Sequence, residues 1–369
     1  MKNQWLWRTA VMCLGAQAFS QAAATENERL EFTGLMAAAG QHLSLSNSQE
    51  GNNTTNGAYV FQPEIIVKAS DVDQFSVKFG FAAGNGLNGY TPFGVAPWAA
   101  DMEDDLKNIN GRNRDYLLTA WYKHSFLVGE THNLAMYFGL IDGTDFLDEN
   151  VYSNDEFTQF MNQALTNGPN FFAPSYDSGA ALVWQRHAIK VHAVAMAVGE
   201  NDGGSAFNYF GAELEYHVNS ALGEGNYRAS LSNTSADFAD PQGNGGKRRN
   251  GIIFSFDQEL GRMFGAFIRL GWQNDDSAIE YENIASGGFD LKGGVWNRPQ
   301  DNIGIGFAHI NGGNLDMEHT LVGELYYRYV VSDILALSLD LQYVSENYRD
   351  PAATTQDGFI PGLRVVAGF

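Results

Sequence analysis

The chain has 369 residues, of which 44% are hydrophobic, 13% aromatic and 18% charged, and its formal net charge is −21. So acidic a chain is a poor candidate for binding nucleic acid. Cys13 is the only cysteine, which argues against a disulfide framework and thiolate-ligated metals. Beyond the first residues, no run of about 20 apolar residues offers a membrane-spanning helix.

The N-terminus has the three parts of a secretory signal peptide. Positive charge precedes an apolar run at residues 9–19, and Ala22 and Ala24 fit the small-x-small cleavage pattern. The apolar run is too short to cross a bilayer as a helix. We therefore expect residues 1–24 to be a signal peptide and residues 25–369 to form the mature, exported domain.

Strict alternation of apolar and polar residues is the main signal along the rest of the chain, and a period of two predicts β-strands. At residues 334–343, for example, alternate leucines share one face opposite Ser338 and Asp340. Such segments occur approximately at 30–40, 57–69, 73–84, 114–128, 131–142, 176–186, 188–199, 207–219, 225–238, 249–260, 263–274, 287–296, 301–310, 319–331, 334–346 and 359–369. The sequence therefore predicts about 16 strands.

The apolar faces of these strands suit lipid better than a second sheet. Tyr343 and the terminal Phe369 place aromatic residues where a membrane barrel has its rims. The connections alternate between short turns and long loops, as outer-membrane barrels require when both termini lie in the periplasm. We predict an all-β fold, a transmembrane antiparallel β-barrel in the bacterial outer membrane, rather than a soluble β-sandwich.

Charged and aromatic side chains on the polar strand faces are the candidates to line the pore, because charge facing lipid is costly. The pore-lining candidates are Lys68, Lys78, Trp121, Lys123, Tyr137, Arg186, Lys190, Glu213, Glu215, Arg269, Glu324, Tyr326, Arg328, Asp340 and Arg364. Each of them is also compatible with a purely structural role in the barrel wall.

A long insertion at about 143–175, after the fifth strand, is the candidate constriction. A capping box at Ser153 and Glu156 predicts a helix start, and Phe157, Phe160, Met161 and Leu165 follow at helical spacing. We expect this short helix to fold inward, the alternative being that it caps the barrel mouth. The constriction candidates are Asp142, Asp145, Asp148, Asp155, Glu156, Gln159 and Asn162. The acidic cluster Asp142, Asp145, Asp148 and Glu149 could focus cations or bind a divalent ion. It lacks the spacing of a calcium loop, so we interpret it as solvated loop charge, as we do the acidic stretch 99–106.

Two regions of the chain resemble the carbohydrate-selective porins of bacterial outer membranes. These are the C-terminal third, from Asp301 to Asp350 and from Asp357 to Phe369, and a central run that includes Tyr137-Phe138-Gly139, Asn170-Phe171-Phe172, Gly179 and Trp184-Gln185. The resemblance implies a 16-stranded barrel through which small sugars diffuse. It also implies an inward-folded helical segment and a constriction of basic, acidic and aromatic side chains.

Other functions remain open at this stage. The strong negative charge allows a general, cation-preferring porin, and the insertion allows a plugged structural barrel. An outer-membrane enzyme is a further alternative, although no G-x-S-x-G motif is present and we predict no catalytic residues, no cofactor and no metal. The expected partners are small sugars, outer-membrane lipids and the barrel-assembly machinery, with no nucleic acid, and the barrel acts as a monomer or a homotrimer.

Overall fold

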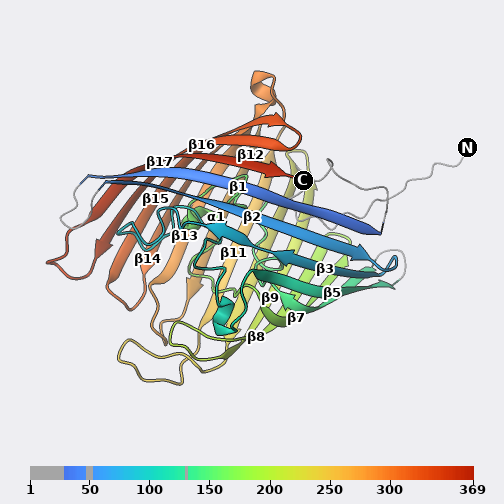
Figure 1. Ribbon diagram of the computed structural model, residues 1–369, viewed down its shortest axis with the longest axis horizontal. Helices are drawn as coiled ribbons and strands as arrows, with labels where there is room; N and C mark the ends of the chain where they lie inside the picture. The colour runs from blue at the N-terminus through green and yellow to red at the C-terminus, as the bar shows by residue number, and fades with distance from the viewer. Residues whose placement is uncertain (1–28, 47–52, 129–131) are drawn as a thin grey trace, which may run out of the picture.

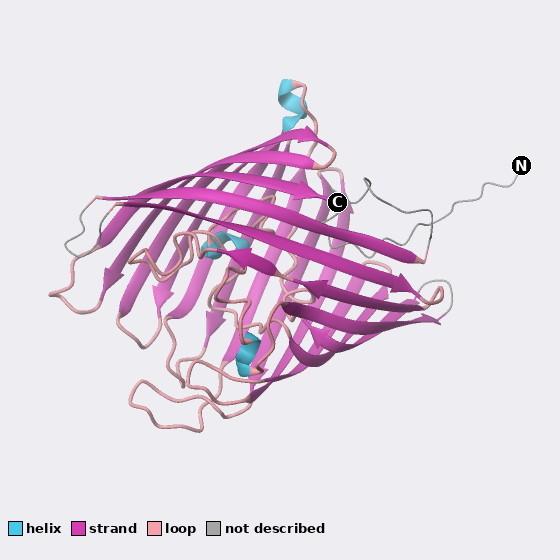
Figure 2. Cartoon of the chain, viewed as in Figure 1, coloured by secondary structure: helices cyan, strands magenta, loops and turns pink. Residues whose placement is uncertain are grey.

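The computed structural model describes residues 29–46, 53–128 and 132–369. The predicted signal peptide lies outside the described residues. Among those described, strands make up nearly all of the regular structure and helices are few and short (Figure 2). None of these helices has the length and apolar character needed to cross a membrane.

The strands form one antiparallel sheet that closes on itself (Figure 1). They are β1 (Leu30–Leu45), β2 (Thr54–Lys68), β3 (Asp73–Phe79), β4 (Phe81–Ala83), β5 (Leu117–Val128), β6 (His132–Ile141), β7 (Asp177–Arg186), β8 (Ile189–Val198), β9 (Phe207–Ser220), β10 (Gly223–Thr234), β11 (Asn250–Leu260), β12 (Phe264–Gln273), β13 (Tyr281–Lys292), β14 (Asn302–Gly312), β15 (Met317–Ser332), β16 (Leu335–Tyr348) and β17 (Gln356–Gly368). Closure comes from β1, which pairs with β2 on one side and with β17 on the other.

The segments β3 and β4 occupy one position in the barrel, because both pair with β2. The break between them lies across from Pro63, which has no backbone N–H to give to a neighbouring strand. Gly80 at the break leaves room for the side chains of Leu106 and Leu118, which a Cβ atom would approach within 3 Å. Counted by position, the described residues form the predicted sixteen-stranded transmembrane barrel.

Most predicted strands are confirmed within a few residues, but one is displaced. The segment predicted at 287–296 begins earlier, because β13 starts at Tyr281, and it ends in a 3₁₀ turn, η2 (Gly293–Trp296). Asp301 accepts a hydrogen bond from Val330 N and thereby holds this turn against β15. The alternation of short turns and long loops also holds in the structure.

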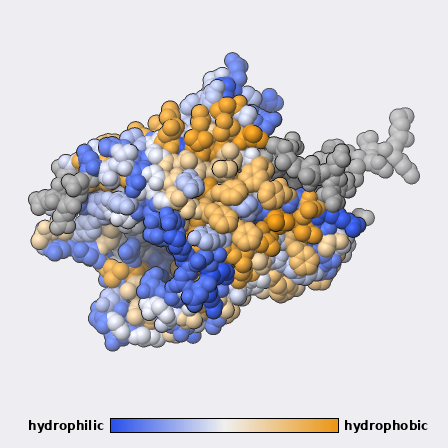
Figure 3. Space-filling view, in the orientation of Figure 1, coloured by the Kyte–Doolittle hydropathy of each residue, from blue (hydrophilic) through white to orange (hydrophobic). Residues whose placement is uncertain are grey.

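Outward side chains are mainly apolar. The space-filling view shows hydrophobic residues gathered over the strands and hydrophilic residues toward the loop end (Figure 3). Near the chain termini, the ring of Phe369 lies 5.6 Å from Phe32 and 5.9 Å from Phe61, so the last residue packs against the first two strands. This aromatic contact, together with the bond from Gly34 N to the Phe369 carbonyl, fastens the end of the chain where the barrel closes.

Two long loops fold into the barrel, and the buried core lies between them and the inner wall. Loop A comprises residues 84–116 and includes η1 (Ile109–Gly111), and loop B comprises residues 142–176 and includes α1 (Gln163–Thr166). Their largest buried side chains include Trp98 and Phe160. Phe160 packs edge-on against Tyr326 of β15, with ring centroids 5.1 Å apart.

Candidate functional site in the barrel lumen

Loop B lies inside the barrel, as predicted, but its helix is shorter than the sequence pattern indicated. Only α1, four residues long, is helical, and Asn162 caps it by accepting a hydrogen bond from Ala164 N. The predicted start at Ser153 is wrong, because the Ser153 hydroxyl donates to the Leu165 carbonyl instead of capping. Asp155 begins a turn by accepting from Phe157 N and Thr158 Oγ1.

Two arginines of the barrel wall hold loop B by its backbone. Arg364 of β17 donates from Nη1 to the Glu156 carbonyl at 2.6 Å and from Nη2 to the Gln159 carbonyl at 2.8 Å. Arg269 of β12 donates to the Ser153 carbonyl at 2.7 Å. Arg269 also pairs with Asp148, at 2.8 Å. Both guanidinium groups are fully buried, so neither reaches a solute in the lumen.

Wall carboxylates hold the same loop by its amides. Glu324 accepts from Met161 N at 2.5 Å and from Asn162 N at 3.0 Å. Glu213 accepts from Asp148 N at 2.7 Å. These bonds use acidic side chains to satisfy backbone donors that a loop inside a barrel would otherwise leave unpaired.

Loop A is a second inward element that the sequence reading treated as solvated. Trp98 is buried and donates from its indole nitrogen to the Glu156 carbonyl, at 3.1 Å. Ala99 N donates to the Met161 carbonyl, and Gln163 N donates to the Ala96 carbonyl, so the two loops run side by side. Loop A therefore supports loop B, and Trp98 and Arg364 share the Glu156 carbonyl as their acceptor.

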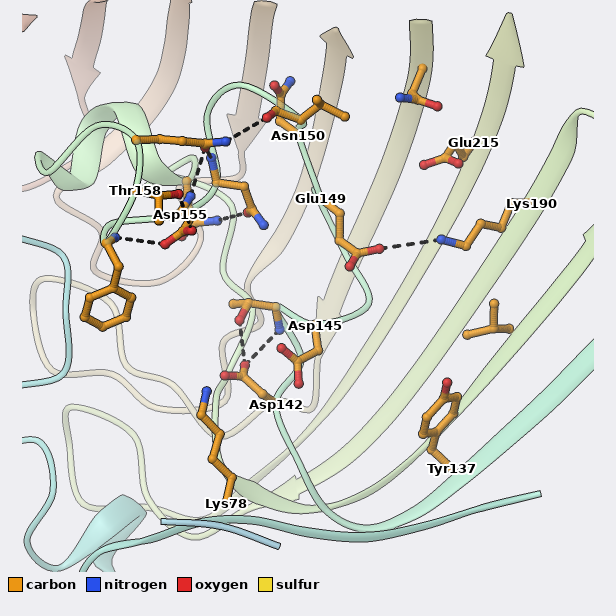
Figure 4. A pocket seen from close by; sticks show the side chains of 18 of the residues that line it. Lys78, Tyr137, Asp142, Asp145, Glu149, Asn150, Asp155, Thr158, Lys190 and Glu215 are labelled. Atoms are coloured by element: carbon orange, nitrogen blue, oxygen red, sulfur yellow. Dashed lines mark hydrogen bonds and ion pairs between the residues drawn. The ribbon is translucent and has the colours of Figure 1, made fainter. Parts of the chain in front are cut away.

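The space that remains in the lumen is a cavity of about 990 Å³. Its lining extends from Gly368 near the terminus to Asn167 and Ser175 of loop B. Figure 4 shows Asp142 and Asp145 on one side of it, with the ammonium group of Lys78 pointing toward Asp142. Across the cavity, Lys190 of β8 forms an ion pair with Glu149 of loop B at 3.5 Å.

A buried arginine that the sequence reading missed organises another part of the wall. Arg228 of β10 pairs with Glu215 at 2.7 Å and with Asp257 at 2.5 Å. The alternation of Tyr227, Ala229 and Leu231 toward lipid was the signal that could have placed Arg228 inside. Asp257 also accepts from Val151 N, so this network touches loop B as well.

The structure separates the predicted site residues into two groups. Those that line the cavity are Lys78, Lys123, Tyr137, Lys190, Glu215, Asp142, Asp145, Asp155, Glu156 and Gln159. Those that lie outside its lining are Lys68, Trp121, Arg186, Glu213, Arg269, Glu324, Tyr326, Arg328, Asp340, Arg364, Asp148 and Asn162.

Each residue outside the lining has a physical reason to be there. Most are covered by the inward loops, and Asp340 accepts a hydrogen bond from Gln342 behind them. Trp121 is partly buried with its ring edge-on to Tyr137. Lys68 pairs with Glu31, near the turn that follows β2, and Arg186 is exposed at the end of β7. Alternation predicts which face of a strand points inward, but it does not predict which loop covers that face.

Carboxyl groups also crowd one another on the loops. Burial and the neighbouring Asp155 raise the pKa of the Glu156 carboxyl to about 8. Burial also raises the pKa of Asp101 to about 6, against the effect of a 2.6 Å hydrogen bond from the Tyr176 hydroxyl. Among the described residues, no group of three or more potential metal ligands comes together. The arrangement can therefore offer hydrogen bonds and charge to a passing solute.

Comparisons with known proteins agree with this architecture. A family model described as "Carbohydrate-selective porin, OprB family" matches residues 34–369. The fold is similar to the high-pH structure of Pseudomonas putida OprB, with a TM-score of 0.70 and 17% identity over 92% of this chain and 94% of that one. It is also similar to the outer membrane channel DcaP of Acinetobacter baumannii, with a TM-score of 0.56 and 9% identity over 92% and 97%.

A curated relative extends the comparison. An uncharacterized protein of Aquifex aeolicus (strain VF5) is 28% identical over 310 residues, which cover 82% of this chain and 86% of that protein. The match spans most of both chains.

Proposed function

The chain belongs to the OprB family of carbohydrate-selective porins, and from that premise we propose which of its residues form the sugar pathway. The protein is an outer-membrane channel for small sugars rather than an enzyme. We propose that sugars cross between loop B and the wall formed by β3, β5, β6 and β8. In this pathway Asp142, Asp155 and Glu156 face Lys78 and Lys190.

The observation that carries this proposal is the cavity of about 990 Å³, whose walls carry both acidic and basic side chains. Lysine donors and carboxylate acceptors can replace water around sugar hydroxyl groups, and binding must stay weak enough to release the solute. Tyr137 offers an aromatic surface in the same lining, with the ammonium group of Lys123 5.5 Å from its ring centroid. Together, the hydrogen-bonding groups and the aromatic surface are suited to binding a neutral sugar, which has a polar, uncharged ring.

A liposome-swelling assay tests the pathway. The mature protein is compared with Thr158→Trp, which places a bulky side chain in the cavity lining, and with Thr354→Trp in an exposed loop. We expect Thr158→Trp to slow glucose entry several-fold and to slow disaccharide entry by a larger factor. Entry rates for Thr354→Trp are expected to match those of the parent. Equal rates for all three folded barrels would contradict the assigned pathway.

The proposal extends to export and assembly. We propose that residues 1–24 are removed as a signal peptide and that residues 25–369 form the barrel domain. The final strand, ending at Phe369, is the segment that the barrel-assembly machinery would receive. A monomer and a homotrimer are both compatible with a cavity inside each barrel, and light scattering of the detergent-solubilised protein distinguishes them.

A further inference from the structure

The cavity carries an uneven charge balance. Among the described residues that line it, twelve side chains are acidic and four are basic, an excess of eight carboxyl groups. The excess is concentrated on the loops, because every charged residue that loops A and B contribute to the lining is acidic. These residues are Asp101, Asp142, Asp145, Glu149, Asp155 and Glu156.

Four basic residues of the barrel interior are already engaged in contacts within the protein. Lys190 pairs with Glu149, and Arg228 is held between two carboxylates. Arg269 and Arg364 lie behind loop B, where they bind its carbonyl groups. These four basic groups are therefore engaged in internal contacts and do little to neutralise the other loop carboxylates.

Two of those carboxylates remain open to a solute. Within the described part of the chain, neither Asp145 nor Glu156 forms an ion pair. Asp145 is exposed and Glu156 is half-buried, and both line the cavity. Their position is fixed, since Arg364 and Trp98 both donate to the Glu156 carbonyl, and Gly143 N donates to the Pro174 carbonyl beside Asp145.

We propose that this cavity sorts monosaccharides by charge, with Asp145 and Glu156 as the specificity-determining residues. Sugars that carry an ammonium group pass faster than neutral sugars, and sugars that carry a carboxylate or phosphate are retarded. The inference rests on the pathway proposed above. Its physical basis is that a lumen lined by one sign of charge raises the local concentration of the opposite sign and repels its own.

The magnitude follows from Coulomb's law. One uncompensated charge about 4 Å from the path of a monovalent solute changes the local concentration of that solute about fivefold in water. Salt reduces this effect. Removal of two such charges is therefore measurable as a change in relative rates. Lys78 acts in the opposite direction, because its ammonium group points toward Asp142 from the other wall (Figure 4).

The test measures entry of glucosamine, glucose and glucuronate into proteoliposomes at low salt and pH 8, and the reversal potential in a KCl gradient. Burial inside the barrel raises the pKa of both Asp145 and Glu156 to about 8, so a substantial share of these two carboxyl groups is ionised at this pH. The parent is compared with the double variant Asp145→Asn/Glu156→Gln, with Lys78→Met, and with Asp333→Asn. Asp333 is exposed in the turn before β16 and lies outside the cavity lining, so it controls for net charge.

For the parent we expect glucosamine to enter fastest and glucuronate slowest, with a potassium-selective reversal potential. The double variant is expected to reduce the ratio of glucosamine to glucuronate about threefold to tenfold, Lys78→Met to increase it, and Asp333→Asn to match the parent. Normal glucose entry with an unchanged ratio in the double variant would overturn the charge proposal alone. Failure of the folded parent to admit glucose would instead count against the sugar pathway.

Discussion

Two walls inside this barrel use the same kinds of side chain for different purposes. On the anchoring wall, the inner faces of β12, β15 and β17, Arg269, Glu324 and Arg364 are buried and bind the backbone of loop B. On the open wall, formed by β3, β5 and β8, Lys78, Lys123 and Lys190 line the cavity. A charge that points inward therefore either fixes the shape of the pore or acts on the solute, depending on what covers it.

The difference has an energetic cause. A charged group without water must find partners, and the loop backbone supplies carbonyl groups to the arginines and amides to the glutamates. Each hydrogen bond to a charged group contributes about 1.5–3 kcal/mol to stability. The anchoring wall is thus expected to govern stability and pore width, and the open wall to govern selectivity.

The largest expected effect comes from removing an anchor. Arg364→Ala deletes both donors to the Glu156 and Gln159 carbonyls and is expected to lower the free energy of unfolding by about 3 kcal/mol or more. The freed turn is then expected to widen the pathway, because it loses both hydrogen bonds from the Arg364 guanidinium. Denaturant unfolding in detergent and single-channel conductance measure the two effects.

Lys123→Ala on the open wall is the matched comparison for this variant. It is expected to leave the free energy of unfolding within about 1 kcal/mol of the parent, since a charged side chain that is open to solvent contributes little to stability. Arg364→Lys keeps the charge but cannot donate from two guanidinium nitrogens at once. We expect its loss of unfolding free energy to lie between those of Arg364→Ala and Lys123→Ala. Equal stability losses at Arg364 and Lys123 would remove the distinction between the two walls.

A smaller effect is expected from the contact between the two loops. Trp98→Phe keeps most of the packing against Phe157 but loses the indole bond to the Glu156 carbonyl. We expect a loss of about 1 kcal/mol in unfolding free energy and a modest rise in disaccharide entry, because Arg364 still holds the same carbonyl. Unaltered disaccharide entry would mean that loop A does not help to position the constriction.

The sequence predicted the barrel better than the division of its interior. Alternation is a local pattern, so β16 and β17 could be recognised from their leucines and aromatic residues alone. It assigns Arg364 and Lys123 to the same class, because both point inward from a strand. Their roles differ through loop B, whose contacts with the wall join residues about 200 positions apart, such as Gln159 and Arg364 at a separation of 205.

The loops were harder to predict for the same reason. Trp98 donates to the carbonyl of Glu156, which lies 58 residues away in the sequence, and no local pattern predicts that contact. The capping box at Ser153 was misleading because the hydroxyl group of this residue, once buried, meets the Leu165 carbonyl and the guanidinium of Arg269. Tertiary contacts overrode a local preference that would hold for an isolated segment.

A pH change offers a milder test of the loop carboxylates. The Glu156 carboxyl, with a pKa raised to about 8 by burial and by Asp155, is neutral well below that pH and charged above it. Asp101 of loop A and Lys78 of β3 also act on it, the first raising and the second lowering its pKa. Burial inside the barrel and Asp142 also raise the pKa of Asp145 to about 8. We therefore expect potassium selectivity to increase severalfold from pH 6 to pH 9, and the double variant Asp145→Asn/Glu156→Gln to flatten that rise. A selectivity that falls with pH would contradict the assignment.

The smallest effect is expected where an open-wall charge is already paired. In the ion pair between Lys190 and Glu149, the two side chains are 20% and 21% exposed and their charged atoms lie 3.5 Å apart. Lys190→Met should therefore change the free energy of unfolding by less than about 1 kcal/mol. It releases the Glu149 carboxylate into the lumen, so the preference for potassium over chloride should rise about twofold in dilute salt, where screening is weak. Glu149→Gln, which removes the other partner, should lower that preference instead. If Lys190→Met destabilised the barrel as strongly as Arg364→Ala, this lysine would belong to the anchoring wall, and the open wall would be narrower than the cavity lining indicates.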